Sequence, residues 1–206
     1  MGQLKTNAYL LTVKADQFIN DVQNIITQYL HLNFNDYDDE NIPEYSTSYK
    51  VLALSTSGYG ETLYDTVVKT ITDHVKEKTL LKARTSSEFR PLWALLDCWN
   101  NFLQSLWAIS RLLNNLQSFF IDKNIKLDSV DVFSKKIFTT EIVMQQGVIE
   151  KLDGFLRNST NTDYRGRVYN QVPDMFELLN EANGRRISIE ILTSRSKVSS
   201  LTVSKS

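Results

Sequence analysis

Glycine and proline are scarce in this chain, and their scarcity narrows the fold class. The 206 residues include 7 Gly and 3 Pro, whereas a protein rich in sheets and tight turns needs many more of both. Hydrophobic residues make up 42% of the chain and aromatic residues 11%, which is enough for a substantial core. The composition therefore predicts an all-α fold of one large or two small domains.

Cysteine, unbalanced charge and long apolar runs are lacking as well. Cys98 is the single cysteine, so an internal disulfide is impossible, and we expect a reducing compartment, the cytoplasm or the nucleus. The formal net charge of −1 gives no reason to expect a nucleic-acid partner. Because the sequence shows neither a run of roughly 18 apolar residues nor a signal peptide, we expect no membrane contact.

Catalytic and metal-binding patterns are also missing. Two histidines, His31 and His74, together with Cys98 are too few for a zinc site of the usual composition. The stretch 57–62 (SGYGET) lacks the lysine and the spacing of a phosphate-binding loop. The acidic run 36–40 lacks the glycine and the final glutamate of a calcium loop. We therefore predict a protein that is not an enzyme and that holds no metal and no cofactor.

The longest helical pattern covers residues 93–121, and we expect it to be a central helix. Its apolar side chains recur at intervals of three and four residues, the spacing that lines one face of a helix. They are Leu92, Leu95, Leu96, Trp99, Leu103, Leu106, Trp107, Leu113, Leu116 and Phe120. Apolar residues also occupy much of the remaining surface, and a helix of this kind is usually buried on several sides.

Shorter helices are expected on both sides of this central helix. Their predicted ranges are about 15–32, 43–54, 61–79, 128–156 with an interruption at Gly147, and 168–181. Polar breaks are predicted at 33–41, 55–60, 122–126 and 158–167. We expect a flexible segment over residues 1–14, in which residues 1–13 are extended or poorly ordered, a helical domain over 15–185, and a mobile tail or the start of a further repeat over 186–206.

Paired aromatic residues are the feature that most suggests a binding surface. Tyr45 and Tyr49 lie one helical turn apart, and Phe119 and Phe120 end the central helix just before a polar break. Tyrosines at this spacing often form the half-buried edge of a core. Alternatively, they form a protein-binding face, because tyrosine offers a large rigid contact with a polar tip.

Five short motifs occur along the chain, and their order and spacing carry more information than any one of them alone. They are Tyr-x-x-x-Tyr at 45–49, Gly-Glu-x-Leu-Tyr at 60–64, Thr-x-His-Val at 72–75, Phe-Ile at 120–121, and Ile-Phe followed by Ile-Val at 137–143. In this order and spacing the chain resembles the first N-terminal repeat of the cullins, and within that family it most resembles cullin-3-like members. The resemblance covers about residues 16–182.

The resemblance implies a non-catalytic scaffold of a cullin-RING ubiquitin ligase, acting in the cytoplasm or the nucleus. In that family the first repeat binds a substrate adaptor, which is a BTB-domain protein for cullin-3-like members and a Skp1-like or elongin C-like protein for others. The RING protein would bind only through a C-terminal region that we expect to be absent here. By position, the adaptor-binding residues would be Ile42, Tyr45, Ser48, Tyr49, Leu52, Phe119, Phe120 and Lys123.

Other functions also fit a helical bundle of this kind. A rod from a membrane-tethering complex has similar antiparallel helices, although the near-neutral charge and the lack of a basic helix argue against direct membrane contact. A truncated cullin mimic could occupy an adaptor without recruiting the ligase. An enzyme is disfavoured, because the sequence shows no cluster of acid, base and nucleophile.

Overall fold

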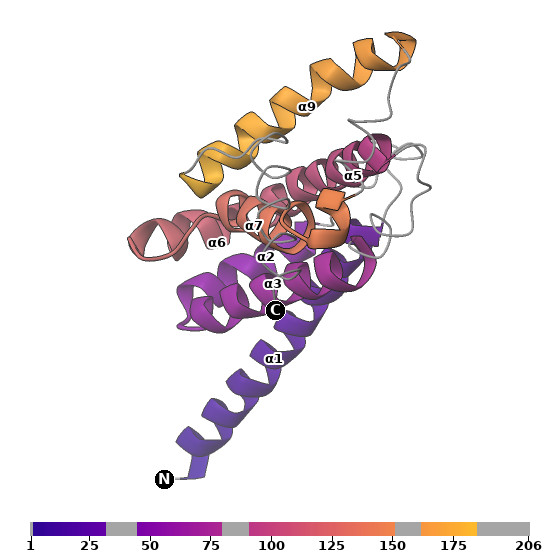
Figure 1. Ribbon diagram of the computed structural model, residues 1–206. Helices are drawn as coiled ribbons and strands as arrows, with labels where there is room; N and C mark the ends of the chain where they lie inside the picture. Colours follow the sequence, from indigo (N-terminus) through magenta and orange to yellow (C-terminus); the bar gives the residue numbers. More distant parts are fainter. Residues whose placement is uncertain (1, 32–44, 80–90, 151–161, 185–206) are drawn as a thin grey trace, which may run out of the picture. The chain divides into compact units, whose positions relative to one another are not determined.

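Helix is the regular secondary structure throughout the described part of this computed structural model, residues 2–31, 45–79, 91–150 and 162–184 (Figure 1). The elements in chain order are α1 (Gly2–His31), α2 (Tyr45–Thr56), α3 (Gly60–His74), η3 (Val75–Thr79), α5 (Pro91–Leu112), α6 (Asn114–Phe119), η4 (Ile121–Lys123), α7 (Val130–Phe138), η5 (Thr139–Val143) and α9 (Thr162–Asn183). η4 is a 3₁₀ turn, whereas η3 and η5 are π-helical turns. The all-α prediction is confirmed.

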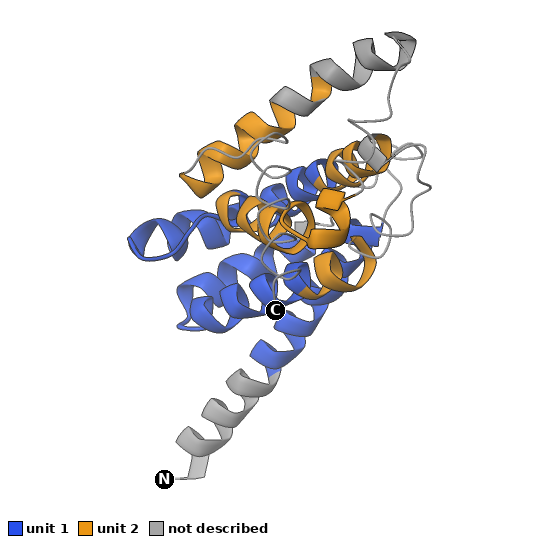
Figure 2. Cartoon of the chain, viewed as in Figure 1, with its two compact units in different colours: residues 1–72, 103–131 blue, residues 73–102, 132–206 orange. Residues whose placement is uncertain are grey.

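The chain forms two compact units, and each unit is assembled from two separate segments (Figure 2). Unit 1 comprises residues 1–72 and 103–131, and unit 2 comprises residues 73–102 and 132–206. The first half of α5 belongs to unit 2 and its second half to unit 1. The helix that the sequence predicts as central therefore contributes core residues to both units.

In unit 1, α2 packs against both α1 and α6. The buried side chains of α1 recur every three or four residues, as expected for an amphipathic helix; they are Ala15, Ile19, Val22, Ile26, Tyr29 and Leu30. Lys50 of α2 forms an ion pair of 2.7 Å with Asp21 of α1. The hydroxyl of Ser105 donates a hydrogen bond of 3.0 Å to the carbonyl of Tyr29, which joins α5 to α1.

The turn between α2 and α3 lies where the sequence predicts a break. Gly58 has a φ of +87°, a conformation that costs glycine little and other residues much more. The backbone N–H of Tyr59 donates to the carbonyl of Leu54 at 3.2 Å, the long bond that closes a Schellman motif at the end of a helix. Local turn chemistry therefore sets the end of α2.

In unit 2, an aromatic cluster surrounds Phe138, the last residue of α7. The Phe138 side chain is fully buried. Trp99 meets it edge to face, with 5.0 Å between ring centroids and an interplanar angle of 62°. Phe102 stacks on it at 5.3 Å and 26°. Both partners come from the first half of α5, so this cluster fixes α7 to α5.

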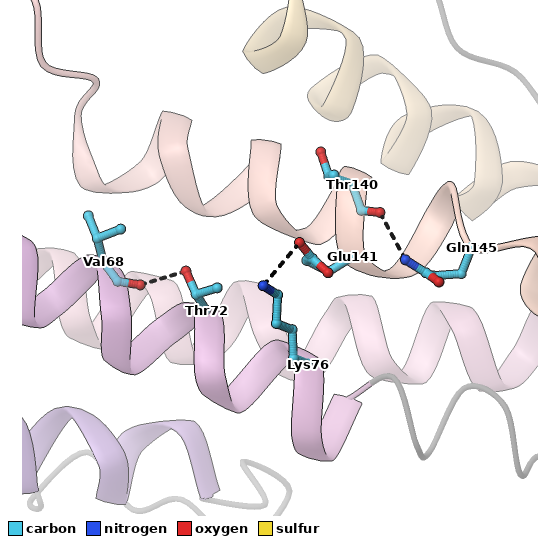
Figure 3. Close-up of polar contacts among 6 residues, drawn as sticks. All are labelled: Val68, Thr72, Lys76, Thr140, Glu141 and Gln145. Atoms are coloured by element: carbon cyan, nitrogen blue, oxygen red, sulfur yellow. Dashed lines mark hydrogen bonds and ion pairs between the residues drawn. The ribbon is translucent and has the colours of Figure 1, made fainter.

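The two π-helical turns of unit 2, η3 and η5, contact each other. Lys76 and Glu141 point toward one another across this contact, with 3.6 Å between Nζ and Oε1 (Figure 3). At the far end of η5, the side-chain amide of Gln145 donates to the carbonyl of Thr140 at 3.4 Å. Asn183 of α9 donates to the hydroxyl of Thr139 at 2.8 Å, which links α9 to η5.

Two helices begin earlier than the sequence predicts. α1 starts at Gly2 rather than near Ala15, so residues 2–13 are helical and the prediction of an extended backbone there is wrong. This stretch has no proline, and its apolar residues Leu4, Ala8 and Leu11 continue the helical spacing of the residues that follow. α9 starts at Thr162 rather than near residue 168 and ends at Asn183, so the second half of the predicted polar loop 158–167 is helical. The predicted tail, residues 186–206, lies outside the described residues.

The central helix is broken at Leu113, which the sequence does not predict. Leu113 has φ −92° and ψ 10°, outside the helical range. Leu112 and Leu113 are both buried, although neighbouring residues of a regular helix point about 100° apart. Two residues later, the side-chain amide of Asn115 donates to the backbone carbonyl of Ser48 at 3.2 Å. The break therefore lies next to tertiary contacts of both α5 and α6.

The inward orientation that the helical pattern predicts for Trp107 is wrong. Its side chain is 53% exposed, and it lies on the polar side of α5 beside Gln104 and Arg111, which are also exposed. The Arg111 guanidinium lies 4.8 Å from the centroid of the Trp107 ring. This cation–π contact, together with the aliphatic stem of the arginine, covers part of the ring and makes its exposure less costly.

Candidate protein-interaction face

Apart from Ile42, the sequence-predicted interaction residues come from two segments of unit 1 that contact each other, α2 and the corner formed by α6 and η4. The contact includes the hydrogen bond of 3.2 Å from Asn115 of α6 to the carbonyl of Ser48 in α2. Tyr49 directly follows Ser48, so this bond fixes α6 beside the turn of α2 that carries the exposed tyrosine. Two segments widely separated in the sequence thus form one surface.

Large side chains are exposed on both segments of this surface. Tyr49 of α2 is 63% exposed and Phe119 of α6 is 41% exposed. Across the described residues, the other large hydrophobic side chains that are exposed are Trp107 and Ile125. Isolated exposed apolar residues are common, whereas apolar residues gathered on one surface often mark an interaction site. Half of this small group lies on the two contacting segments.

Lys123 of η4 lies over the exposed phenylalanine. Its ammonium nitrogen is 5.5 Å from the centroid of the Phe119 ring, within the range of a cation–π contact. The side-chain amide of Gln117 donates to Asp122 at 2.5 Å, which ties α6 to η4. The α6–η4 corner therefore exposes the Phe119 ring and the Lys123 charge side by side, and the hydrogen bond between Gln117 and Asp122 holds its backbone in place.

The segment after η4 is tied to α3 through a buried tyrosine. The Tyr64 hydroxyl donates to the backbone carbonyl of Asp128 at 3.1 Å. Burial raises the pKa of this hydroxyl above its ordinary value of 10.0, and the carboxylates of Asp128 and Asp65 raise it further. At neutral pH Tyr64 is therefore a neutral donor that anchors the chain beyond the exposed corner.

The remaining predicted residues differ in how they contribute to this surface. Ser48 contributes its carbonyl to the bond with Asn115, and Leu52 is partly exposed. Phe120 is partly buried, and its ring lies against Gly60 at the start of α3. Tyr45 begins α2, but its side chain lies outside the described residues, as does the whole of Ile42. Asn115 and Gly60 were missed by the sequence analysis, because their roles depend on contacts between distant segments.

Metal-binding and membrane-spanning features are absent from the part of the chain that the structure describes. Across residues 2–31, 45–79, 91–150 and 162–184, His, Cys, Asp and Glu side chains do not gather into a group that could hold a metal ion. No described helix combines the length and the hydropathy needed to cross a bilayer. Cys98 is buried among the core residues.

Comparison with protein families gives a match over most of the chain. The family description "Cullin alpha solenoid domain" matches residues 8–193, far more than half of the 206 residues. No individual curated protein sequence matches the chain significantly. The matched domain is a helical scaffold, in agreement with the all-helical structure of the described residues. The chain therefore belongs to the cullin family and carries its α-solenoid domain.

Proposed function

We propose that this chain is the adaptor-binding module of a cullin-RING ubiquitin-ligase scaffold, and that α2 and the α6–η4 corner form its adaptor-binding face. The observation that carries the proposal is the exposure of Tyr49 and Phe119 on two segments joined by the bond from Asn115 to Ser48. The family resemblance predicts an adaptor face at these positions. Exposure and resemblance therefore point to the same surface on independent grounds.

The proposed partner is a BTB-domain adaptor or a related protein of the Skp1-like or elongin C-like type. The motif Gly-Glu-x-Leu-Tyr at 60–64, which resembles cullin-3-like members, favours the BTB class. The proposed role is binding without catalysis, since cullin α-solenoids are generally non-catalytic scaffolds. Such a ligase scaffold would act in the cytoplasm or the nucleus, and the RING protein would bind outside the proposed adaptor-binding face.

Aromatic side chains of this kind have the properties of interface hot spots. A tyrosine that is more than half exposed can bury a large rigid surface on binding while its hydroxyl keeps a polar partner. Truncation of a hot-spot residue to alanine typically costs about 2 kcal/mol or more of binding free energy. At about 1.4 kcal/mol for each factor of ten, Tyr49→Ala should weaken adaptor binding by roughly thirtyfold.

Isothermal titration calorimetry of this chain against a BTB domain, a Skp1-like protein and an elongin C-like protein tests the proposal. Trp107→Ala is the matched control, because Trp107 is an exposed aromatic of unit 1 that lies outside both segments. We expect one adaptor class to bind, Tyr49→Ala to weaken that binding, and Trp107→Ala to leave it unchanged. Equal losses in both variants, or no binding by any adaptor, would contradict the proposal. In the second case, liposome flotation would test the tethering-rod alternative.

A further inference from the structure

We propose, on the basis of the function above, that Gly60 is a positioning residue for the adaptor face. It accommodates the ring of Phe120 and thereby directs Phe119, rather than Phe120, toward the partner. The resemblance alone places both phenylalanines on the face. The structure separates them, because Phe119 is 41% exposed, whereas Phe120 is partly buried against the start of α3.

The contact between Gly60 and Phe120 leaves no space for a side chain at position 60. A Cβ atom added there would lie 2.5 Å from Cδ2 and 2.6 Å from Cγ of the Phe120 ring, and 3.1 Å from its Cβ. Carbon atoms in contact normally lie about 3.5–4.0 Å apart. The ring, the helix that begins at Gly60, or both would have to move to accept even an alanine.

Packing, rather than backbone conformation, is what requires glycine at this position. The described glycines with positive φ are Gly58 and Gly184, so Gly60 has a conformation that any residue can adopt. Gly60 is also the first residue of α3, and alanine is the better helix former wherever there is room for it. Glycine is therefore required at position 60 because a Cβ atom would collide with the Phe120 ring.

Phe120 has little freedom to move away from this contact. Its backbone N–H donates to the carbonyl of Leu116 at 3.0 Å. Its carbonyl accepts a hydrogen bond of 2.7 Å from the side chain of Asn124. Leu116 and Ile121, on the two sides of the phenylalanine pair, are buried. A displaced Phe120 ring would therefore move the α6–η4 corner with it, including Phe119.

The consequence for binding follows from the position of this corner. Phe119 and Lys123 are presented together, with 5.5 Å between the ammonium and the ring centroid, and α6 is joined to α2 through Asn115 and Ser48. Shifting the corner changes the position of Phe119 relative to Tyr49. A partner that contacts both side chains would then lose part of its fit.

The test uses the full chain and begins without a partner. Amide hydrogen exchange of residues 114–124 should be faster in Gly60→Ala than in the wild type, because the corner loses packing. Gly147→Ala is the matched control, since a Cβ atom added at this helical glycine would meet no atom within 4 Å. Once Phe120→Ala has removed the ring, adding Gly60→Ala should cause no further change. Unchanged exchange in Gly60→Ala, or an equal effect with and without the ring, would overturn the inference.

The same variants are then titrated with the adaptor that binds the wild type. Gly60→Ala should weaken binding about tenfold, which corresponds to about 1.4 kcal/mol, and Phe119→Ala should weaken it more than Phe120→Ala does. Normal binding by Gly60→Ala, or a larger loss in Phe120→Ala, would refute the positioning role. If the wild type binds no adaptor, the proposed function is wrong. The exchange results would then still test the packing of Phe120 against Gly60, but not its role in adaptor binding. If Gly60→Ala does not fold, recovery of folding in the double variant with Phe120→Ala supports the contact, and continued unfolding refutes it.

Discussion

Replacing Phe138 with leucine should destabilise unit 2 by an amount that the aromatic cluster predicts. Leucine keeps an apolar side chain in this fully buried position, but it removes the ring contacts with Trp99 at 5.0 Å and Phe102 at 5.3 Å. Each aromatic contact contributes about 0.5–1.5 kcal/mol beyond the burial of its area. The sum for two contacts is about 1–3 kcal/mol, whereas Phe138→Ala would cost about 3–5 kcal/mol.

Urea unfolding followed by circular dichroism measures this difference directly. Ile125→Ala is the control, because the Ile125 side chain is fully exposed and its loss should change stability by less than about 0.5 kcal/mol. A double-mutant cycle with Phe102→Leu should give a coupling energy of about 0.5–1.5 kcal/mol. If Phe138→Leu is as stable as the control variant, α7 is not held to α5 by this cluster, and the description of unit 2 is wrong.

Three further perturbations test other contacts, each by its effect on the free energy of unfolding. Tyr64→Phe should cost about 1 kcal/mol at neutral pH, because it removes the bond to the carbonyl of Asp128. Because folding raises the pKa of Tyr64 above 10.0, the contribution of Tyr64 to the free energy of unfolding is complete below pH 10 and is lost as the pH rises further. Tyr64→Phe should abolish this part of the stability loss at alkaline pH. If the wild type and the variant lose stability identically at alkaline pH, Tyr64 is not the group responsible. Ser134→Ala should raise stability by about 1 kcal/mol, because this buried hydroxyl has no hydrogen-bond partner among the described residues, and a clear loss of stability would contradict that. Lys76→Met should cost less than about 1 kcal/mol, since the ion pair with Glu141 is long at 3.6 Å and its lysine is half exposed, and a larger cost that persists in about 1 M salt would show that the pair matters more than its geometry indicates.

Much of the fold could be predicted from the sequence because helical periodicity and turn chemistry are local properties. The break between α2 and α3 covers residues 57–59, within the predicted break at 55–60, and the buried face of α1 from Ala15 onward follows its apolar spacing. The break at Leu113 could not be predicted in this way. It lies beside a hydrogen bond between Asn115 and Ser48, which are 67 positions apart, and nothing in the local pattern shows that these two residues meet.

The interaction face could be predicted only in part for the same reason. Spacing places Tyr49 and Phe119 on helices but does not decide whether they face the core or the solvent, and Trp107 is exposed although its spacing predicts burial. Gly60 appears in the sequence as a helix boundary, whereas in the structure it is also a packing partner of Phe120. Whether Phe119 or Phe120 is buried depends on the residue that each ring contacts in the folded chain, and helical spacing does not contain that information.

We propose above that α2 and the α6–η4 corner together bind a substrate adaptor. Amide hydrogen exchange of the chain, alone and saturated with the adaptor that it binds, tests this claim most directly. Added protection should be concentrated in residues 45–56 and 114–123, with little change in α9, residues 162–183. Protection centred on α9, or none on α2 despite saturated binding, would contradict it.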